Sequence, residues 1–360
     1  MDRITWLFEG EVEPAESVRR DAAWMRRAAA AGPVADPVIR FWTAPRDTIL
    51  LGRFRRLPEE LSTKNPAPAL SRRLGGGRTV LSGPGFLNMS MVVPEARELT
   101  DRRGGASTRI LTEKIMNRYV RGLLSGLNSL GVKAFYPGRE WVTASGRRLA
   151  FISFDLDAAG VCLFESVIAV DGNAGRGDPF LASHGVVYQS GPGSPINVST
   201  LQGAAPSRAG IGVEAVASAI AAGYAARTGV EVVRETSAPD DLPAVEPGGA
   251  DWLASRSARS RQDRHAAVDI PVGALEVMLG TTDDGRLTHV TLAGDFLANS
   301  PAVAEYEAAL EGCPAIWEAV GTITDRIFLT QPNTILGLGS LKTLPDTIMN
   351  AVAPAQSATS

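Results

Sequence analysis

A glycine-rich segment places the strongest constraint on the fold of this chain. Residues 71–88 read SRRLGGGRTVLSGPGFLN and contain two predicted strands, 79–81 and the start of 86–93. Three glycines without Cβ atoms let the backbone approach a ligand closely and direct N–H groups at an anion. The segment lacks the GxxxxGK[ST] pattern, and no helix follows the glycines as a dinucleotide fingerprint requires. It therefore indicates either a ligand-binding loop of another kind or a surface turn.

The pattern of apolar residues around this segment predicts an α+β fold. Apolar residues recur at helical spacing over 15–31, 108–130 and 213–224. Strands and helices do not alternate regularly, which favours α+β over a parallel α/β sheet. The remaining strands are predicted at 38–42, 48–54, 141–145, 147–156 and 161–170, the third and fourth forming a hairpin through Gly146.

Composition divides the chain into two predicted domains. Few apolar residues occur over 236–264, as expected for a linker or an extended connection. Beyond it, TTDDG between two apolar runs predicts a hairpin, and Ser300-Pro301 predicts an N-cap followed by the first residue of a helix. We expect a large domain at 1–235, a small α+β domain at 265–350 and a disordered tail at 351–360.

Charge and cysteine content argue against several classes of function. A net charge of −3 offers no basic surface for nucleic acid or a membrane. No apolar run reaches 18 residues and the N-terminus lacks a signal-peptide pattern, so we expect a cytoplasmic protein. Two cysteines, Cys162 and Cys313, provide neither a disulfide framework nor a four-thiolate zinc site, and the three histidines lack metal-ligand spacing. No metal site is therefore predicted from these residues.

Lysine is rare in this chain. Four of the 36 basic residues are lysines: Lys64, Lys114, Lys133 and Lys342. The scarcity is typical of a GC-rich bacterial genome, which favours arginine codons. It also leaves few candidates for any mechanism that requires a catalytic lysine.

Four segments resemble the lipoate–protein ligase family in order and spacing. They are RFWTAPRDTILLGRF (40–54), RRLGGGRTVLSGPGFLN (72–88), GREWVTASGRRLAF (138–151) and GRLTHVTLAGDF (285–296). This family is grouped with octanoyl transferases and biotin–protein ligases. The resemblance implies a mixed-sheet catalytic domain with a small accessory domain. It also implies ATP and Mg²⁺ as cofactors, an acyl-adenylate intermediate, and transfer of the acyl group to a lysine of a lipoyl-type carrier domain.

The resemblance also places candidate site residues on this chain. The candidate catalytic residues are Arg148, which stands at the position of the family's lysine, and the pair Arg72 and Arg73. The residues expected to bind the acid or its adenylate are Gly75, Gly76, Gly77, Arg78, Ser82, Gly85, Asn88, Glu140, Phe151 and Glu165.

Several of these residues depart from the family's pattern. Arg78 replaces a glycine, Glu140 replaces the asparagine of an Asn-Asp pair, and Phe151 replaces a small residue. Arginine at position 148 is planar and permanently charged, whereas lysine is a compact charge that can titrate. Together with Glu165, these changes predict a shorter and more polar pocket. We therefore expect ATP-dependent activation of a small polar carboxylic acid and its transfer to a carrier lysine or a small amine.

Two other functions are consistent with the same residues. The SGPG sequence at 82–85 resembles octanoyl transferases, and Cys162 is a candidate nucleophile for acyl transfer without ATP. A small buried cysteine in the core is the more ordinary interpretation of Cys162. Loss of the family's functional residues is also consistent with a non-catalytic binding homologue.

Overall fold

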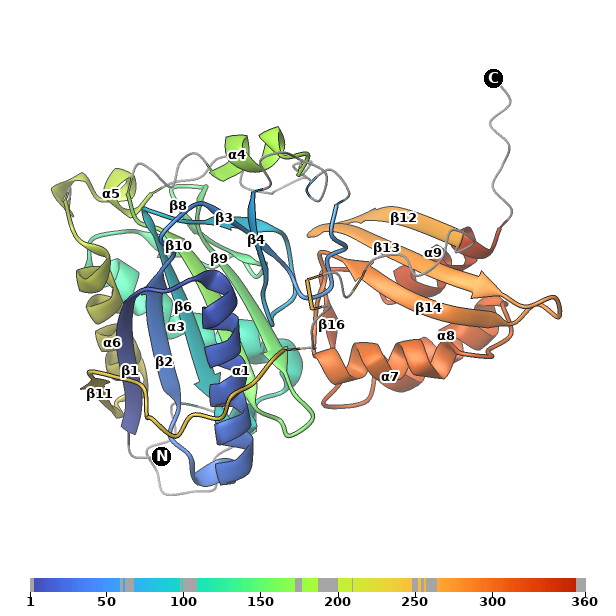
Figure 1. The fold of residues 1–360 in the computed structure, drawn as a ribbon, viewed down its shortest axis with the longest axis horizontal. Helices are drawn as coiled ribbons and strands as arrows, with labels where there is room; N and C mark the ends of the chain where they lie inside the picture. The colour runs from blue at the N-terminus through green and yellow to red at the C-terminus, as the bar shows by residue number, and fades with distance from the viewer. Residues whose placement is uncertain are drawn as a thin grey trace.

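An eight-stranded mixed sheet forms the centre of the larger part of the molecule (Figure 1). The computed structural model describes residues 3–58, 61, 68–97, 99, 109–171, 177–186, 200–208, 210–247, 252–253, 256 and 264–353. In spatial order the strands are β11 (Glu231–Glu235), β1 (Arg3–Glu11), β2 (Val38–Thr43), β6 (Phe86–Val93), β10 (Cys162–Ala169), β9 (Arg147–Leu156), β8 (Trp141–Ala144) and β7 (Ala134–Phe135). Strands β11 and β2 run parallel to β1, and the other pairs are antiparallel.

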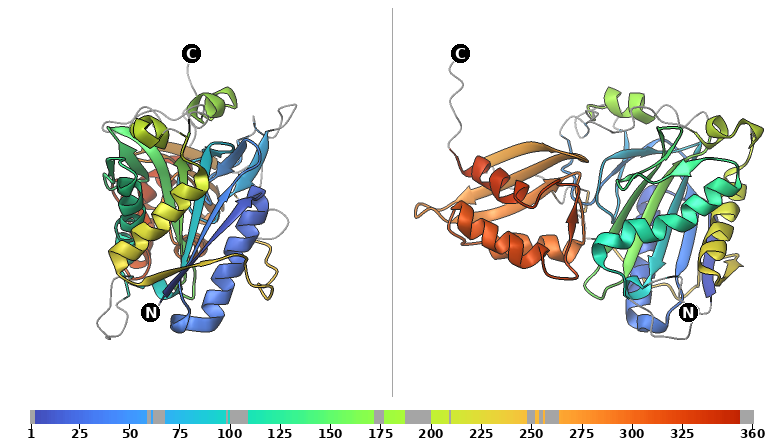
Figure 2. Two further views of the ribbon diagram at one scale, coloured as in Figure 1. Left: turned by 90° about the vertical axis from the view of Figure 1, so that its left-hand side faces the viewer. Right: turned by 180° about the vertical axis from the view of Figure 1, so that it is seen from behind.

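Helices cover both faces of this sheet (Figure 2). Helix α1 (Pro14–Ala31) packs on one face, and α3 (Ile115–Ser129) and α6 (Val213–Thr228) pack on the other. The central strands are therefore buried on both sides, which explains the nearly continuous apolar sequence of β6. Helices α1, α3 and α6 were all predicted; α3 begins at Ile115, and residue 108 of the predicted helix lies outside the described residues.

A second, three-stranded sheet has the order β4 (Ala69–Arg72), β3 (Thr48–Leu51) and β5 (Val80–Ser82). The sequence placed strands at 38–42 and 48–54 on either side of a short loop. Both strands form, but the chain crosses from the large sheet into the small one between them. In the same way, β5 and β6 belong to different sheets. The glycine run lies between β4 and β5, which both belong to the small sheet.

The C-terminal part has its own sheet and core (Figure 1). Its elements are β12 (Arg264–Ile270), β13 (Gly273–Thr281), β14 (Leu287–Gly294), β15 (Leu297–Ala298), α7 (Ser300–Leu310), α8 (Trp317–Phe328), β16 (Ile335–Leu336) and α9 (Thr343–Val352). The predicted hairpin is the antiparallel pair β13–β14. The N-cap of α7 is Asn299, and Ser300 is its first helical residue, so the prediction for Ser300 is wrong by one position.

The segments predicted as linker and tail are partly described. Residues 236–246 run along α1 and line two grooves with it. Helix α9 continues through Val352, and residues 354–360 of the predicted tail lie outside the described residues. The fold class is α+β, as predicted. Within the described ranges, no helix combines the length and the apolar sequence that a membrane span requires.

Candidate active site

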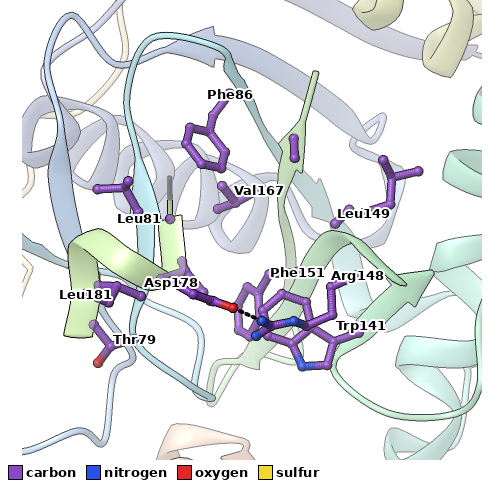
Figure 3. Close-up of a pocket in the computed structure, with 14 residues that line it drawn as sticks. Thr79, Leu81, Phe86, Trp141, Arg148, Leu149, Phe151, Val167, Asp178 and Leu181 are labelled. Carbon is purple, nitrogen blue, oxygen red and sulfur yellow. Dashed lines mark hydrogen bonds and ion pairs between the residues drawn. The ribbon is translucent and has the colours of Figure 1, made fainter. Parts of the chain in front are cut away.

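A cavity of about 50 Å³ lies between β5, the β8–β9 hairpin, β10 and helix α4 (Gly177–Ser183) (Figure 3). Its wall is mainly apolar, and the polar lining residues are Thr79, Arg148 and Asp178. A cavity that holds benzene measures roughly 150 Å³, so lining side chains must move before an acyl chain of six carbons can occupy this one. The apolar lining residues are Val80, Leu81, Phe86, Trp141, Leu149, Ala150, Phe151, Val167, Ala169 and Leu181.

A break in the β8–β9 pairing brings Arg148 to this cavity. Phe151 pairs with Trp141, but the register shifts before Arg148, which pairs with Thr143. The shift leaves Leu149 as an extra residue in β9, and such a bulge changes the face toward which a neighbouring side chain points. Arg148 and Phe151 therefore line the same cavity, although strict alternation would place them on opposite faces of the strand.

The guanidinium of Arg148 is held in a defined position. Its Cζ lies 4.8 Å from the ring centroid of Trp141, and its Nη2 donates to the carboxylate of Asp178 (Figure 3). The Arg148 side chain is 9% exposed, whereas that of Asp178 is 46% exposed. The Trp141 ring in turn packs edge to face with the Phe151 ring, and the two ring centroids lie 5.4 Å apart. A nearly buried cation with a carboxylate partner thus borders an apolar space.

Arg72, also predicted as catalytic, lies outside the lining of this cavity. Its guanidinium donates to the carbonyl oxygens of Gly52 (2.9 Å), Arg53 (3.1 Å) and Leu253 (3.2 Å). Burial, and secondarily the neighbouring arginines, lower the pKa of Arg72 to about 9. These contacts fix the backbone after β3 and offer no donor toward the cavity.

Arg73 has a similar environment on the other side of the glycine run. It donates to the carbonyl oxygens of Leu50 (3.3 Å), Gly76 (3.2 Å) and Arg78 (2.8 Å). Its Cζ lies 4.4 Å from the centroid of the Phe151 ring, on which it packs as a cation on an aromatic face. Arg73 therefore supports both the glycine run and one wall of the cavity.

The glycine run itself makes close contacts with the rest of the chain. The amides of 75–77 donate, in order, to Glu165 Oε2 (2.9 Å), the carbonyl oxygen of Phe154 (3.4 Å) and the carbonyl oxygen of Phe296 (2.9 Å). Burial raises the pKa of Glu165, and the charge of Arg73 opposes the effect. In this arrangement each of the three N–H groups already has an acceptor.

Arg78 and Glu140 form a buried pair beside the glycines. Arg78 Nε lies 3.1 Å from Glu140 Oε1 and donates to the carbonyl oxygen of Val272 (2.6 Å) in the C-terminal part. Burial raises the pKa of Glu140, which the charge of Arg78 partly opposes. Neither this pair nor Glu165 is part of the cavity lining. The pocket is therefore apolar, and the prediction of a more polar one has to be corrected.

Three further predicted residues shape the turn between β5 and β6. Asn88 donates from its side-chain amide to Ser82 Oγ (2.8 Å), and both groups are buried. Gly85 has φ +91°, a left-handed conformation that favours glycine, and its carbonyl oxygen accepts from the amide of Val170 (2.9 Å). These residues join β5 and β6 to the end of β10 and lie outside the cavity lining.

Cys162 lies on the opposite face of β10 from the cavity. Side chains alternate along the strand, so Cys162 and Phe164 face α3 and α6, whereas Val167 and Ala169 line the cavity. Burial raises the pKa of the Cys162 thiol well above its usual range. Its environment is that of a core residue. Among the described residues, no cluster of three or more His, Cys, Asp or Glu side chains could hold a metal ion.

The sequence analysis missed Trp141 as the support of Arg148, and it missed Asp178 and Leu181 on α4. Asp178 precedes Pro179 within the first turn of this short helix. Proline in a first turn is a recognised signal for the start of a helix, so α4 was open to prediction. The pairing with Arg148 was not, because it depends on bringing together positions 30 residues apart.

Comparisons with known proteins agree with this architecture. The family model described as lipoyl protein ligase A/B catalytic domain matches residues 13–185. Octanoyltransferase LipM of Staphylococcus aureus is 31% identical over 137 residues, which cover 37% of this chain and 46% of that protein. The chain spans 34%, 46% and 61% of the lengths of the three curated relatives that it matches.

Two solved structures share the fold at low sequence identity. LipL1 of P. falciparum, solved in complex with lipoate, has a TM-score of 0.67 and 11% identity over 96% of this chain and 99% of that chain. A bipartite lipoate protein ligase of Thermoplasma acidophilum, studied with its E2 lipoyl domain, has a TM-score of 0.52 and 14% identity over 72% of this chain and 100% of that chain. Residues 13–185, slightly less than half of the chain, thus match the model of the lipoyl protein ligase A/B catalytic domain, and the two solved structures show that the chain shares the fold of lipoate ligases.

Proposed function

We propose that this protein joins a short, apolar acyl group to an amine, with the acyl chain in the cavity beside α4 and its carbonyl oxygen at Arg148. Members of the family are ligases and acyltransferases. The observation that carries the proposal is an apolar cavity that ends at a nearly buried guanidinium. Apolar walls bury a hydrocarbon chain, and a guanidinium donates hydrogen bonds to a carbonyl or carboxylate oxygen.

Arg148 supplies the electrostatic part of the chemistry. When an amine attacks the carbonyl carbon, negative charge develops on the carbonyl oxygen, and a fixed cation beside that oxygen stabilises it. The stacking of Arg148 on Trp141 holds the guanidinium in place before the substrate arrives. The resemblance assigns Arg148 to the position of the family's lysine, and its charge does not titrate.

The source of the activated acyl group separates two routes. ATP with Mg²⁺ is the route implied by the resemblance to lipoate ligases. In this arrangement the glycine run does not fit a phosphate, because its three amides donate to acceptors of the chain itself. That observation, with the similarity to an octanoyltransferase, favours a second candidate: transfer from an already activated donor such as a thioester, without ATP.

Two kinds of amine are consistent with the proposed acceptor. The archaeal ligase with the same fold was studied with an E2 lipoyl domain, which supports a lysine of a carrier domain as one acceptor. A small-molecule amine is the other. In either case the amine attacks the acyl carbon directly, because Cys162 faces away from the cavity.

The experiment offers both kinds of acyl donor to the same protein in separate reactions. One reaction contains hexanoyl thioester and a lysine amine; the other contains hexanoate, ATP and Mg²⁺ with the same amine. Product mass and pyrophosphate release are measured. We expect amide from the thioester, and Arg148→Gln should lower its rate by about 100-fold. The matched control is Arg147→Gln, which changes the exposed arginine next to it.

Each alternative predicts a different result. Pyrophosphate release with hexanoate would establish the ATP route. Binding of acyl groups without product from either donor would indicate a non-catalytic homologue. An unchanged rate in Arg148→Gln would contradict the role given to Arg148.

A further inference from the structure

We propose that Asp178 makes the cavity selective for uncharged, activated acyl groups and against free carboxylates, by neutralising Arg148. The inference rests on the proposed function, because it takes the cavity to be the acyl site. It concerns the chemical form of the substrate, which the match to the family model leaves open. A thioester or another ester-type donor would enter, whereas the free acid would be disfavoured.

The charges around the cavity support this selectivity. Among the lining residues that the structure describes, Arg148 and Asp178 carry the charge, and the two are paired. The wall is therefore neutral as a whole. Thr79 is polar but uncharged, and the other lining residues are apolar. A neutral wall matches a neutral ligand.

A free acid meets an obstacle that a thioester does not. At neutral pH a carboxylic acid is ionised, so its carboxylate must displace Asp178 from Arg148 or lie beside a like charge. A neutral carbonyl oxygen accepts a hydrogen bond from Arg148 without adding charge. Because Asp178 is 46% exposed, its displacement costs little, about 1 kcal/mol, which corresponds to about fivefold in affinity.

A different interpretation of the same ion pair makes the opposite prediction. If the contact only fastens α4 to β9, then removing Asp178 loosens one wall and weakens every ligand. If Asp178 competes with carboxylates, its removal strengthens the binding of a carboxylate and leaves a neutral ligand unaffected. The sign of the change therefore distinguishes the two interpretations.

The experiment measures dissociation constants of hexanoate and hexanamide by calorimetry at pH 7, with the full chain. These probes share a chain length and differ in head-group charge. We expect Asp178→Asn to bind hexanoate about fivefold more tightly than the wild type and hexanamide within about twofold of it. Asp178→Glu keeps the charge and should keep the wild-type preference. Asp241→Asn is the matched control, because Asp241 pairs with Arg27 away from the cavity.

The possible results distinguish a failure of the role of Asp178 from a failure of the proposed acyl site. Equal or weaker binding of hexanoate to Asp178→Asn, with both ligands still sensitive to Arg148→Gln, overturns the role of Asp178 and leaves the acyl site standing. Weakening of both ligands by Asp178→Asn also overturns it and favours the fastening interpretation. If neither ligand binds any variant, the cavity is not an acyl site and both proposals fail. Melting temperatures of all variants verify that each one is folded.

Discussion

The glycine run at 75–77 and the cavity beside α4 differ in what their polar groups contact. In the glycine run, each amide donates to an acceptor of the chain, and Gly77 bonds to the C-terminal part. In the cavity, the ion pair of Arg148 and Asp178 borders an apolar space of about 50 Å³. Consecutive glycines suit a ligand loop, but they equally suit a place where two segments of backbone must touch. The comparison shows that the glycine segment is a packed joint in this chain, whereas the cavity that we propose as the acyl site lies beside α4.

The joint also connects the two parts of the molecule. Phe54, after β3, stacks on Phe296 at 4.8 Å. Asp155 at the end of β9 accepts hydrogen bonds from the amide (2.8 Å) and hydroxyl (2.9 Å) of Ser300, at the start of α7. The glycines are therefore covered by the C-terminal part, and a phosphate would reach their amides only if this contact opened.

We expect the largest effect on stability from a side chain added inside the joint, at Gly52. A Cβ added at Gly52 would lie 1.9 Å from the carbonyl oxygen of Gly77, which is backbone and has no rotamer to escape through. We expect Gly52→Ala to lower the free energy of unfolding by about 3 kcal/mol in urea titrations.

The control for this prediction is the same substitution in helix α8. A Cβ at Gly321 meets the Trp317 ring at 3.4 Å, an ordinary contact, so Gly321→Ala should raise stability by about 0.5–1 kcal/mol through helix propensity. A Gly52→Ala protein as stable as the wild type would show that the joint is loosely packed.

A smaller loss is expected from the contact between the two parts. Asp155 bonds to Ser300 through both oxygens and to Arg53 at 3.2 Å. Removing this buried carboxylate with Asp155→Ala should cost about 2 kcal/mol of unfolding free energy. Because Asp155 and Ser300 share the contact, the double variant with Ser300→Ala should cost less than the sum of the single changes.

Ligand binding to the same variants tests whether the joint and the cavity are independent of each other. The cavity does not involve Ser300, so the dissociation constant of hexanamide should stay unchanged in Ser300→Ala. Strict additivity of the two stability changes would contradict the direct contact. Altered hexanamide binding would show that the joint and the cavity act together.

Local sequence patterns predict much of the fold. Strand β6 is apolar except for Asn88 and Ser90 and is bounded by Gly85 and Pro94, and α1 shows helical spacing after Pro14. The β8–β9 hairpin follows from its turn at Gly146, which has φ +75°. These elements are determined by residues close together in the chain, and the prediction recovered them.

The candidate site depends on contacts that no local pattern reports. Asp155 and Ser300 are 145 residues apart, and Arg148 reaches Asp178 across 30. The extra residue in β9 decides that Arg148 faces the cavity, and a bulge leaves no sign in the hydrophobic pattern. The resemblance supplied the position of Arg148, whereas its partner required the three-dimensional arrangement.

The buried carboxylate of Glu165 should make the stability of the joint depend on pH. Burial raises the pKa of Glu165 above its usual 4.5, and Arg73 only partly opposes this. As the pH rises above 4.5, the unfolded chain releases a proton that the folded chain keeps. The free energy of unfolding therefore falls, by up to about 1.4 kcal/mol per pH unit for one group, until the pH passes the raised pKa.

The variant Glu165→Gln should remove this contribution, because glutamine does not titrate. We expect a flatter dependence of the unfolding free energy on pH above 4.5, measured by urea titration at half-unit steps. Glu231→Gln, at an exposed residue of β11, is the matched control. A wild-type slope in Glu165→Gln would show that the buried carboxylate bonded to Gly75 is not the titrating group.

The smallest effect is expected at Phe86, on the side of the cavity opposite Arg148, and it tests whether the acyl chain lies in this cavity. Phe86 lies across the cavity from Arg148 (Figure 3), so shortening it extends the space for the chain's far end. Phe86→Leu should improve the affinity for octanamide relative to hexanamide by about fourfold, the contribution of roughly one additional buried methylene. Phe164→Leu is the control, because Phe164 contacts Tyr119 on the face of β10 that is turned away from the cavity. It should lower the free energy of unfolding about as much as Phe86→Leu does, without changing the preferred chain length. An unchanged length preference in Phe86→Leu would place the acyl chain outside this cavity, and the cavity would then not be the ligand site.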